Sequence, residues 1–128
     1  MVVDTSALLA ILLREDDSTQ FEHLIAHAAE PLLSAVAVVE FGMIALSRRG
    51  FTAEEVESRL CDWGLVILPV TAASARLALA AFDRYGRGRH PAKLNFGDCF
   101  AYALAKERGM PLLFKGNDFA LTDIAAAI

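Results

Sequence analysis

Three carboxylates in the sequence lack a counter-charge among their local neighbours: Asp4, Glu40 and Asp98. Asp4 directly follows a short apolar run at the N-terminus. Glu40, in SAVAVVEFGMIA, has only apolar residues four positions before it and three and four positions after it, which would be its neighbours on a helix. Asp98, in LNFGDCFAYALA, has only Ala and Tyr on its own helical face. An unpaired buried carboxylate costs several kcal/mol or becomes protonated, so each acid needs a partner from elsewhere in the fold.

Acids that share one site favour a hard cation. If the fold brings these three side chains together, their mutual repulsion raises at least one pKa unless a positive charge neutralises the group. Mg²⁺ and Mn²⁺ prefer carboxylate oxygens and water as ligands, and either ion would supply that charge. The spacing alone does not establish that the acids converge.

Each acid also has a simpler structural explanation. Asp4 can hydrogen-bond to the backbone of a turn that follows a strand, and Glu40 can reach solvent from the edge of its helix. Asp98 can be the third residue of a helix that Asn95 caps, in a reciprocal arrangement that satisfies unpaired backbone N–H groups. An acid in the first turn also gains roughly 0.3 to 1 kcal/mol from the helix dipole.

The elements that must position the acids are short strands separated by helices. Strands are predicted at Val2–Val3, at Pro31–Leu33, in LVILPV and in PLLF. Six helices are predicted. The first three lie in ALLAILL, with Thr5 and Ser6 as capping candidates, through Phe21, Leu24, Ile25 and Ala28, and from Ser34 to Gly50. The other three run from a Thr52–Glu55 capping box to Trp63, from Thr71 with Ala75, Ala78, Leu79 and Phe82 along one face, and from Asn95 to Gly109. This alternation predicts a mainly parallel sheet covered on both faces, in which ligands bind beyond the C-terminal ends of the strands.

The composition indicates one domain over residues 1–128, because 55% hydrophobic residues supply an ample core. The net charge of −4 excludes an overall positive field for nucleic acid, so any polyanion site must be local. The N-terminus lacks the basic segment of a secretory signal, and no apolar run approaches the ~18 residues of a membrane span, so we expect a soluble cytoplasmic protein. Cys61 and Cys99 are too few for a disulfide framework, and we expect both to be buried reduced thiols.

One local segment, RYGRGRHPAKLN, is strongly basic. It holds Arg84, Arg87, Arg89 and Lys93, interleaved with glycine and proline, and only Asp83 offsets them. A flexible loop that contacts phosphates without reading bases is one interpretation. A solvated loop, or a loop that pairs with an acidic protein, is the other.

Four segments, taken in order, resemble PIN-domain ribonucleases, and within them the VapC-type toxins of bacterial toxin–antitoxin pairs. They are MVVDTSALLAIL, SAVAVVEFGMIA with its lone Glu40, LNFGDCFAYALAKERGMPLLFKGNDF and the closing TDI. The likeness extends over essentially the whole chain. It implies a single PIN domain, built as a three-layer α/β/α sandwich with a mainly parallel sheet, and a Mg²⁺-dependent endoribonuclease that hydrolyses RNA phosphodiester bonds.

The resemblance assigns catalysis to Asp4, Glu40 and Asp98, with Asp4 and Asp98 as the metal ligands and Glu40 and Asp118 as weaker candidates. In the implied mechanism, water activated by one or two ions attacks the RNA phosphorus and leaves a 5′-phosphate and a 3′-hydroxyl. Glu40 would orient a second ion or the attacking water. Ser6 would either contact the site through its hydroxyl or simply cap its helix.

The fourth acid is where the sequence departs from the family. In the commonest pattern this acid lies two positions nearer the last core strand than Asp118, where this chain has Gly116. Asp118, or water held by Asn117, is the candidate replacement. The departure leaves open an alternative function, that of a catalytically idle PIN-like module that binds a protein or RNA.

The resemblance implies three partners: an RNA substrate such as a tRNA or rRNA, a small VapB-like antitoxin that covers the active site, and a second copy of the chain that extends the RNA groove. It also favours the RNA interpretation of the basic segment. The helices through Phe21 and Phe41 offer apolar faces either for such interfaces or for ordinary core packing. A thiol hydrolase built on Cys99 and His90 is disfavoured, because the sequence displays no oriented imidazole or oxyanion site, and His90 is assigned to the basic loop.

Overall fold

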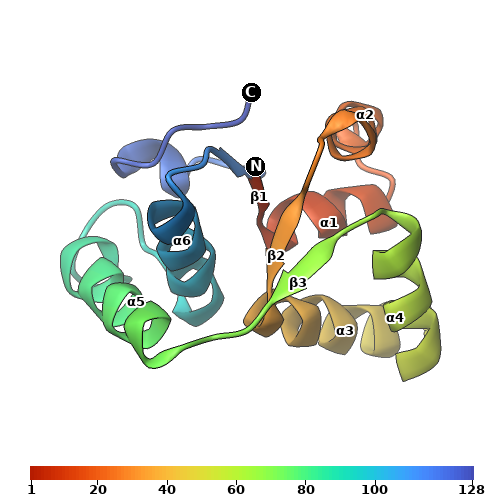
Figure 1. Ribbon diagram of the computed structural model, residues 1–128, viewed down its shortest axis with the longest axis horizontal. Coiled ribbons are helices and arrows are strands. Elements are labelled where there is room, and N and C mark those ends of the chain that lie inside the picture. The colour runs from red at the N-terminus through yellow and green to blue at the C-terminus, as the bar shows by residue number, and fades with distance from the viewer.

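A four-stranded parallel sheet forms the centre of the molecule (Figure 1). The computed structural model describes all 128 residues. The strands are β1 (Val2–Val3), β2 (Leu32–Ser34), β3 (Val66–Leu68) and β4 (Leu112–Leu113), in the order β3-β2-β1-β4. Every neighbouring pair is parallel, so each connection must cross back over the sheet, and helices make these crossings.

Helices cover both faces of the sheet. They are α1 (Thr5–Leu12), α2 (Ser18–His27), α3 (Ala35–Arg49), α4 (Ala53–Asp62), α5 (Ala72–Tyr85) and α6 (Phe96–Arg108), and a short 3-10 helix η1 (Phe119–Leu121) precedes the C-terminal segment. In Figure 1, α5 and α6 lie to the left of the sheet and α1 to α4 to its right. The predicted three-layer sandwich is therefore confirmed. None of these helices is both long enough and apolar enough to span a membrane.

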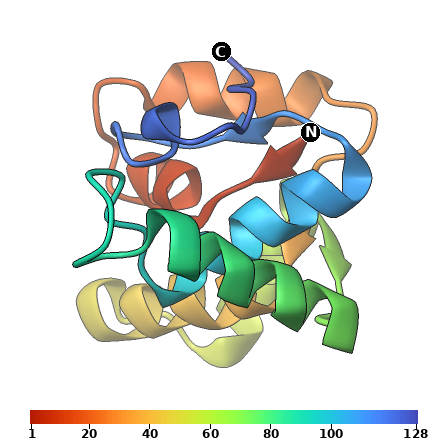
Figure 2. The same ribbon diagram turned by 90° about the vertical axis from the view of Figure 1, so that its left-hand side faces the viewer.

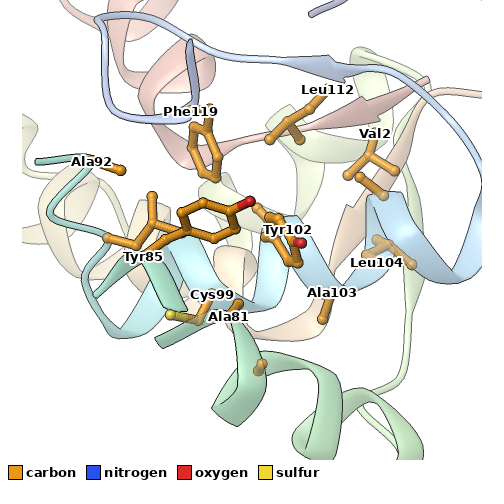
Figure 3. Packing of buried hydrophobic residues seen from close by; sticks show 14 of the residues in the cluster. Val2, Ala81, Tyr85, Ala92, Cys99, Tyr102, Ala103, Leu104, Leu112 and Phe119 are labelled. Carbon is orange, nitrogen blue, oxygen red and sulfur yellow. The ribbon is translucent and has the colours of Figure 1, made fainter. Parts of the chain in front are cut away.

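Alternation along the short strands divides the core into two layers. The strand residues in the layer of α5 and α6 are Val2, Leu32 and Leu112, and those in the layer of α1 to α4 are Val3, Leu33 and Leu113. Because successive side chains on a strand point to opposite faces, two apolar residues per strand anchor both helical layers. Figure 3 shows the first layer, where Tyr85 of α5 and Tyr102 of α6 pack close to Phe119.

The strand order reverses at β1, so the C-terminal ends of β1 and β4 lie at the reversal point. The chain runs from β1 to β2 to β3 in one direction and then returns to place β4 on the other side of β1. Ligands of open α/β sheets bind where the order reverses in this way. Asp4 follows β1 and Lys115 follows the end of β4 by two residues, so both chain segments emerge at this end of the sheet. In Figure 2 the start of α1, the loop after α5 and the loop after β4 all lie at the left-hand end of the molecule.

The C-terminal segment is tied across α6 by one carboxylate. Asp123 accepts hydrogen bonds from the Tyr102 hydroxyl and the Lys106 ammonium group, each over 2.8 Å. These contacts, with the Lys106 bond the largest cause, lower the pKa of Asp123 to about 2. Ala127 and Leu112 are also joined by a backbone hydrogen bond of 2.9 Å, so the final residues extend the sheet beside β4.

The helix boundaries read from capping residues are largely confirmed. Ser34 caps α3, Thr52 and Glu55 form a capping box at the start of α4, and Gly50 and Gly109 end α3 and α6 in the left-handed conformation. The start of α1 was predicted wrongly. Asp4 is its N-cap, and Thr5 and Ser6 are its first two residues, because the Asp4 carboxylate itself accepts the hydrogen bond from the Ser6 backbone N–H.

The apolar stripe predicted along one face of α5 is present, but most of it lies on the surface. Of the stripe Ala75, Ala78, Leu79 and Phe82, only Ala78 is buried, and Leu79 is 71% exposed. The buried residues of α5 are Ser74, Ala78, Ala81 and Tyr85. Small residues on this face let α5 lie close against α6, and the larger apolar side chains are left on the surface.

Three further expectations have different outcomes in the structure. The faces of α2 and α3 that carry Phe21 and Phe41 pack into the core, where these side chains are 2% and 0% exposed. The strand in LVILPV forms as β3, but as an edge strand with its side chains partly exposed, because only β2 pairs with it. Cys99 is buried as expected, whereas Cys61 is exposed on α4.

Candidate active site

Asp4 is held rigidly at the end of β1 by its own helix. The side chain is 3% exposed, and its Oδ2 atom accepts hydrogen bonds from both the backbone N–H and the hydroxyl of Ser6, the first over 2.9 Å. Burial raises the pKa of Asp4, the Ser6 hydrogen bonds oppose that rise, and the nearby Glu40 charge adds to it. Both hydrogen bonds end on Oδ2, so the direction of the carboxylate is set while Oδ1 makes no such bond.

Ser6 joins this carboxylate to the loop after β4. Its Oγ donates to Asp4 and accepts a hydrogen bond of 3.0 Å from the backbone N–H of Lys115. The Lys115 side chain in turn pairs with Glu15 and with Asp17 in the segment between α1 and α2. Ser6 is therefore a positioning residue within the first turn of α1, and the helix-capping role considered for it is excluded.

Glu40 reaches the same region from α3. Its Oε2 accepts a hydrogen bond of 2.9 Å from the Thr5 hydroxyl. Its carboxylate also lies directly against the first turn of α6, because a Cβ added at Gly97 would come within 1.9 Å of Glu40 Oε1. Burial raises the pKa of Glu40, the Thr5 hydrogen bond lowers it, and the charge of Asp98 raises it again. Glu40 therefore does not turn outward to solvent from an exposed helix edge.

Asp98 forms the predicted capping box with Asn95. Its Oδ2 accepts from the Asn95 backbone N–H over 2.8 Å, and its own N–H donates to the Asn95 side chain over 3.0 Å. Burial, followed by the charges of Asp4 and Asp118, raises the pKa of Asp98 to about 6, while the Asn95 bond and Arg87 act to lower it. The cap fixes the carboxylate but does not supply the charge that it lacks.

The fold thus brings the acids of three distant segments into one electrostatic neighbourhood. The charge of Glu40 acts on Asp4, that of Asp98 acts on Glu40, and those of Asp4 and Asp118 act on Asp98. No three acid, histidine or cysteine side chains are drawn close enough to form a ready metal cage. Each carboxylate is instead directed by a neighbouring hydroxyl or backbone N–H, at Ser6, Thr5 and Asn95.

The chemistry of the donor set fits a hard divalent cation. Asp4, Glu40 and Asp98 offer oxygen atoms only, and all three have raised pKa values, so a cation among them would relieve both the repulsion and the desolvation. No lysine or arginine makes an ion pair with any of the three.

The loop after β4 explains the missing fourth acid. Gly116 has a φ of +93°, a backbone conformation in which an L-residue such as aspartate is strained. Asp118 lies exposed just before η1, and its charge is near enough to raise the pKa of Asp98. This loop therefore supports Asp118 as the fourth acid, at a greater distance from the strand than the family pattern implies.

The basic segment divides into paired and unpaired cations. Arg89 pairs with Asp83 over 2.7 Å, and Arg84, which lies in the last turn of α5, is 3.7 Å from Asp123. Arg87 and Lys93 are exposed and make no ion pair, and the charge of Arg87 lowers the pKa of Asp98. Arg87 is therefore the member of this segment that lies beside the acids.

The cysteine and histidine near the acids do not form a catalytic pair. Burial, together with the charge of Asp98, raises the pKa of the Cys99 thiol to about 11, which disfavours the thiolate that a nucleophile needs. His90 packs edge-on against Tyr85 at 5.1 Å between ring centroids, and its Nδ1 accepts the Ala92 N–H over 3.1 Å. His90 thus shapes the basic loop, as expected.

Sequence reasoning missed two residues that shape the site. Thr5 holds Glu40, and Gly97 provides the space that the Glu40 carboxylate fills. Each directly adjoins a recognised acid, Thr5 after Asp4 and Gly97 before Asp98. Their partner is 35 residues from Thr5 along the chain, so no local pattern could have revealed the contact.

The chain is similar to known proteins in sequence and in fold. The family model described as PIN domain matches residues 1–125. VapC ribonuclease Mb0625 of Mycobacterium bovis is 45% identical over 130 residues, which cover 100% of this chain and 98% of that protein. The crystal structure of Mycobacterium tuberculosis VapC20, described as a sarcin-ricin loop cleaving toxin, aligns with a TM-score of 0.76 at 19% identity, over 97% of this chain and 95% of its own. A toxin–antitoxin complex from Klebsiella pneumoniae aligns with a TM-score of 0.70 at 20% identity, over 95% and 92% of the two chains.

The raised pKa of Asp98 predicts a pH-dependent effect on stability. Because its folded pKa is about 6 and its ordinary value is 3.8, ionisation of Asp98 destabilises the fold as pH rises through this range. With allowance for partial exposure, Asp98→Asn should raise the free energy of unfolding by about 1 to 2 kcal/mol at about pH 7.5 and by much less at about pH 4. Urea unfolding in chelator measures both values. Asp62→Asn, at an exposed acid, is the control, and a gain equal at the two pH values would contradict the prediction.

Proposed function

We propose that this chain is the toxin of a toxin–antitoxin pair and a Mg²⁺-dependent endoribonuclease. The premise is that the chain belongs to the PIN domain family and to its VapC ribonucleases. The observation that carries the proposal is the set of acids at the C-terminal end of the sheet. Asp4, Glu40 and Asp98 come from three segments, each is oriented by a separate hydrogen bond, and each has a raised pKa. Acids held together against their repulsion mark a functional site.

Asp4 and Asp98 are the proposed metal ligands, with Glu40 and Asp118 as further acids of the site. When bound, a divalent cation such as Mg²⁺ or Mn²⁺ neutralises the carboxylates and stabilises the negative charge that develops on the phosphoryl oxygens. The first turns of α1 and α6 hold the two ligands in fixed directions. Their hydrogen-bonded atoms are both Oδ2, which leaves Oδ1 of each side chain for ligation.

Glu40 is the proposed proton acceptor for the attacking water. The Thr5 hydroxyl occupies Oε2, so Oε1, beside the Gly97 backbone, is the atom that receives the proton. Its raised pKa makes the carboxylate a stronger base than an exposed glutamate. Arg87 and Lys93 contact the phosphates that flank the reacting one, and Arg84 and Arg89 of the same segment add to its positive charge. The products carry a 5′-phosphate and a 3′-hydroxyl.

Removal of either ligand charge should abolish cleavage and leave the fold intact. We expect purified Asp98→Asn and Asp4→Asn proteins to cleave RNA at least about 100-fold more slowly, since Asn keeps the shape and capping bond of the side chain but not its charge. Gel-based cleavage of a total RNA preparation, with and without Mg²⁺, measures the rates.

Wild-type cleavage should stop with chelator and return with added Mg²⁺, and Asp62→Asn should cleave at the wild-type rate. Cleavage that survives chelator, or full activity in both mutants, would exclude the proposed metal-dependent reaction. A folded wild-type protein that binds RNA without cleaving it would instead indicate the catalytically idle PIN-like module.

The space at Gly97 should be required for Glu40 to act. A Cβ there would come within 1.9 to 2.1 Å of the Glu40 carboxylate, so Gly97→Ala must push that flexible group away from Thr5. We expect cleavage to fall about 10-fold or more, towards the level of Glu40→Gln, with a small change in stability. Gly42→Ala is a matched control in α3, because its Cβ would meet Val56 at an ordinary 3.6 Å. Equal activity of both alanine variants would contradict this role of Gly97.

Three macromolecular partners belong to the proposal. A VapB-like antitoxin would cover the acids in the cytoplasm, where the RNA substrate, such as a tRNA or rRNA, is also found. A second copy of the chain would extend the RNA groove as a homodimer. The large apolar side chains exposed on α3, α5 and the first residue of α6 support such a contact, since extensive exposed apolar patches mark interaction sites. They are Val39, Met43, Leu46, Leu79, Phe82 and Phe96, between 38% and 72% exposed.

Charges placed on this apolar face should break the homodimer. Phe96 lines two adjoining grooves, one between α5 and α6 and one on α3 that also includes Glu40. We expect Met43→Lys and Leu79→Lys together to give a monomer in analytical ultracentrifugation, because burial of two unpaired ammonium groups is unfavourable. Leu121→Lys, at another exposed apolar residue, on η1, should leave the dimer intact. A wild-type protein that is monomeric at every concentration would exclude this interface.

A further inference from the structure

A second charged region lies at the far end of α1 from Asp4. A cleft of about 810 Å³ opens there between α1, α2, α3 and α4, the helices on the right-hand side of Figure 1. Three of its lining residues are arginines: Arg14 just beyond α1, Arg49 at the end of α3, and Arg59 on α4. These residues are distant in sequence, so the fold itself brings their charges together. We call this region the three-arginine cleft.

The arginines of the cleft are not neutralised within the chain. None of the three makes an ion pair. Glu22 is the only acid that lines the cleft, so the lining carries a net positive charge although the chain as a whole is at −4. The Arg59 guanidinium lies over the rings of Phe51 and Trp63, 5.7 Å from each centroid, which holds it in place by cation–π contact. Concentrated, partly pre-ordered positive charge of this kind fits an anion.

The geometry points to the phosphates of an RNA strand as that anion, and we propose the three-arginine cleft as a phosphate-binding subsite outside the site of hydrolysis. The eight residues of α1 span about 12 Å between Asp4 and the cleft, so a strand that leaves the acids crosses it within a few nucleotides. Two of the three acids that follow Arg14, Glu15 and Asp17, are paired with Lys115, which weakens their repulsion of the strand. Planar guanidinium groups bind phosphate through two parallel hydrogen bonds and also stack on unpaired bases.

The subsite rests on the proposed function, because RNA is the substrate of that reaction, but its test measures binding without hydrolysis. Single-stranded RNA of about twelve nucleotides is titrated into Asp98→Asn protein over a series of salt concentrations. The substitutions Arg14→Gln and Arg49→Gln are introduced into this Asp98→Asn protein, singly and together. Both side chains are exposed and unpaired, and thermal unfolding verifies that each protein is folded. Arg48→Gln is the matched control, since it removes the same charge from the neighbouring exposed position of α3, outside the cleft.

We expect the double variant to bind RNA about 10-fold more weakly and with a salt slope smaller by about 1.4, since each phosphate contact to a single strand contributes about 0.7. Arg48→Gln should leave both quantities nearly unchanged. Equal losses in the cleft and control variants would overturn the subsite, because they would reflect overall charge alone. Unchanged RNA binding with weakened antitoxin binding would also overturn it and assign the cleft to an acidic protein segment. RNA binding that depends on the cleft in a protein whose wild type never cleaves RNA would support the subsite while refuting the ribonuclease.

Discussion

The repulsion between carboxylates gathered at one end of a parallel sheet is the constraint on which the rest of the site depends. Two consecutive residues at the start of α1 offset part of this repulsion, because Thr5 donates a hydrogen bond to Glu40 and Ser6 donates one to Asp4. Hydrogen bonds to the charged form lower a carboxylate pKa and so offset part of the burial and repulsion that raise it. The same helical turn therefore directs acids that come from two different elements.

Ionisation of the acids at the site also lowers the stability of the fold. Asp98 has a pKa of about 6 although its capping box is complete, so its ionisation lowers the stability of the fold at neutral pH. Elsewhere in the chain, ion pairs stabilise the charged form of an acid, as at Asp123, whose partners lower its pKa to about 2. Functional sites commonly retain such locally unfavourable groups because the ligand or substrate compensates for them. The contrast between these two aspartates separates the site from the scaffold within one chain.

Much of the scaffold could be predicted from local signals, and the contacts of the site could not. Capping residues and alternating apolar strands act over a few positions, so Ser34, Thr52 and Asn95 were identified as helix starts from the sequence. The rotation of α5 depends on how closely it approaches α6, so the pattern predicts a stripe through Leu79 and Phe82 but not its place on the surface. The pairing of Thr5 with Glu40 depends on tertiary structure, and the cleft that joins Arg14, Arg49 and Arg59 has no sequence pattern at all.

The close approach of Glu40 to Gly97 has an evolutionary consequence. The two positions lie on different helices, yet the volume available to one is set by the other, because the Glu40 carboxylate occupies the space that a side chain at position 97 would need. Substitutions at these positions should therefore be accepted in pairs: a lineage that acquires alanine at position 97 gains from a shorter acid, aspartate, at position 40. Covariation between the two sites would then record a steric contact that neither position reveals alone.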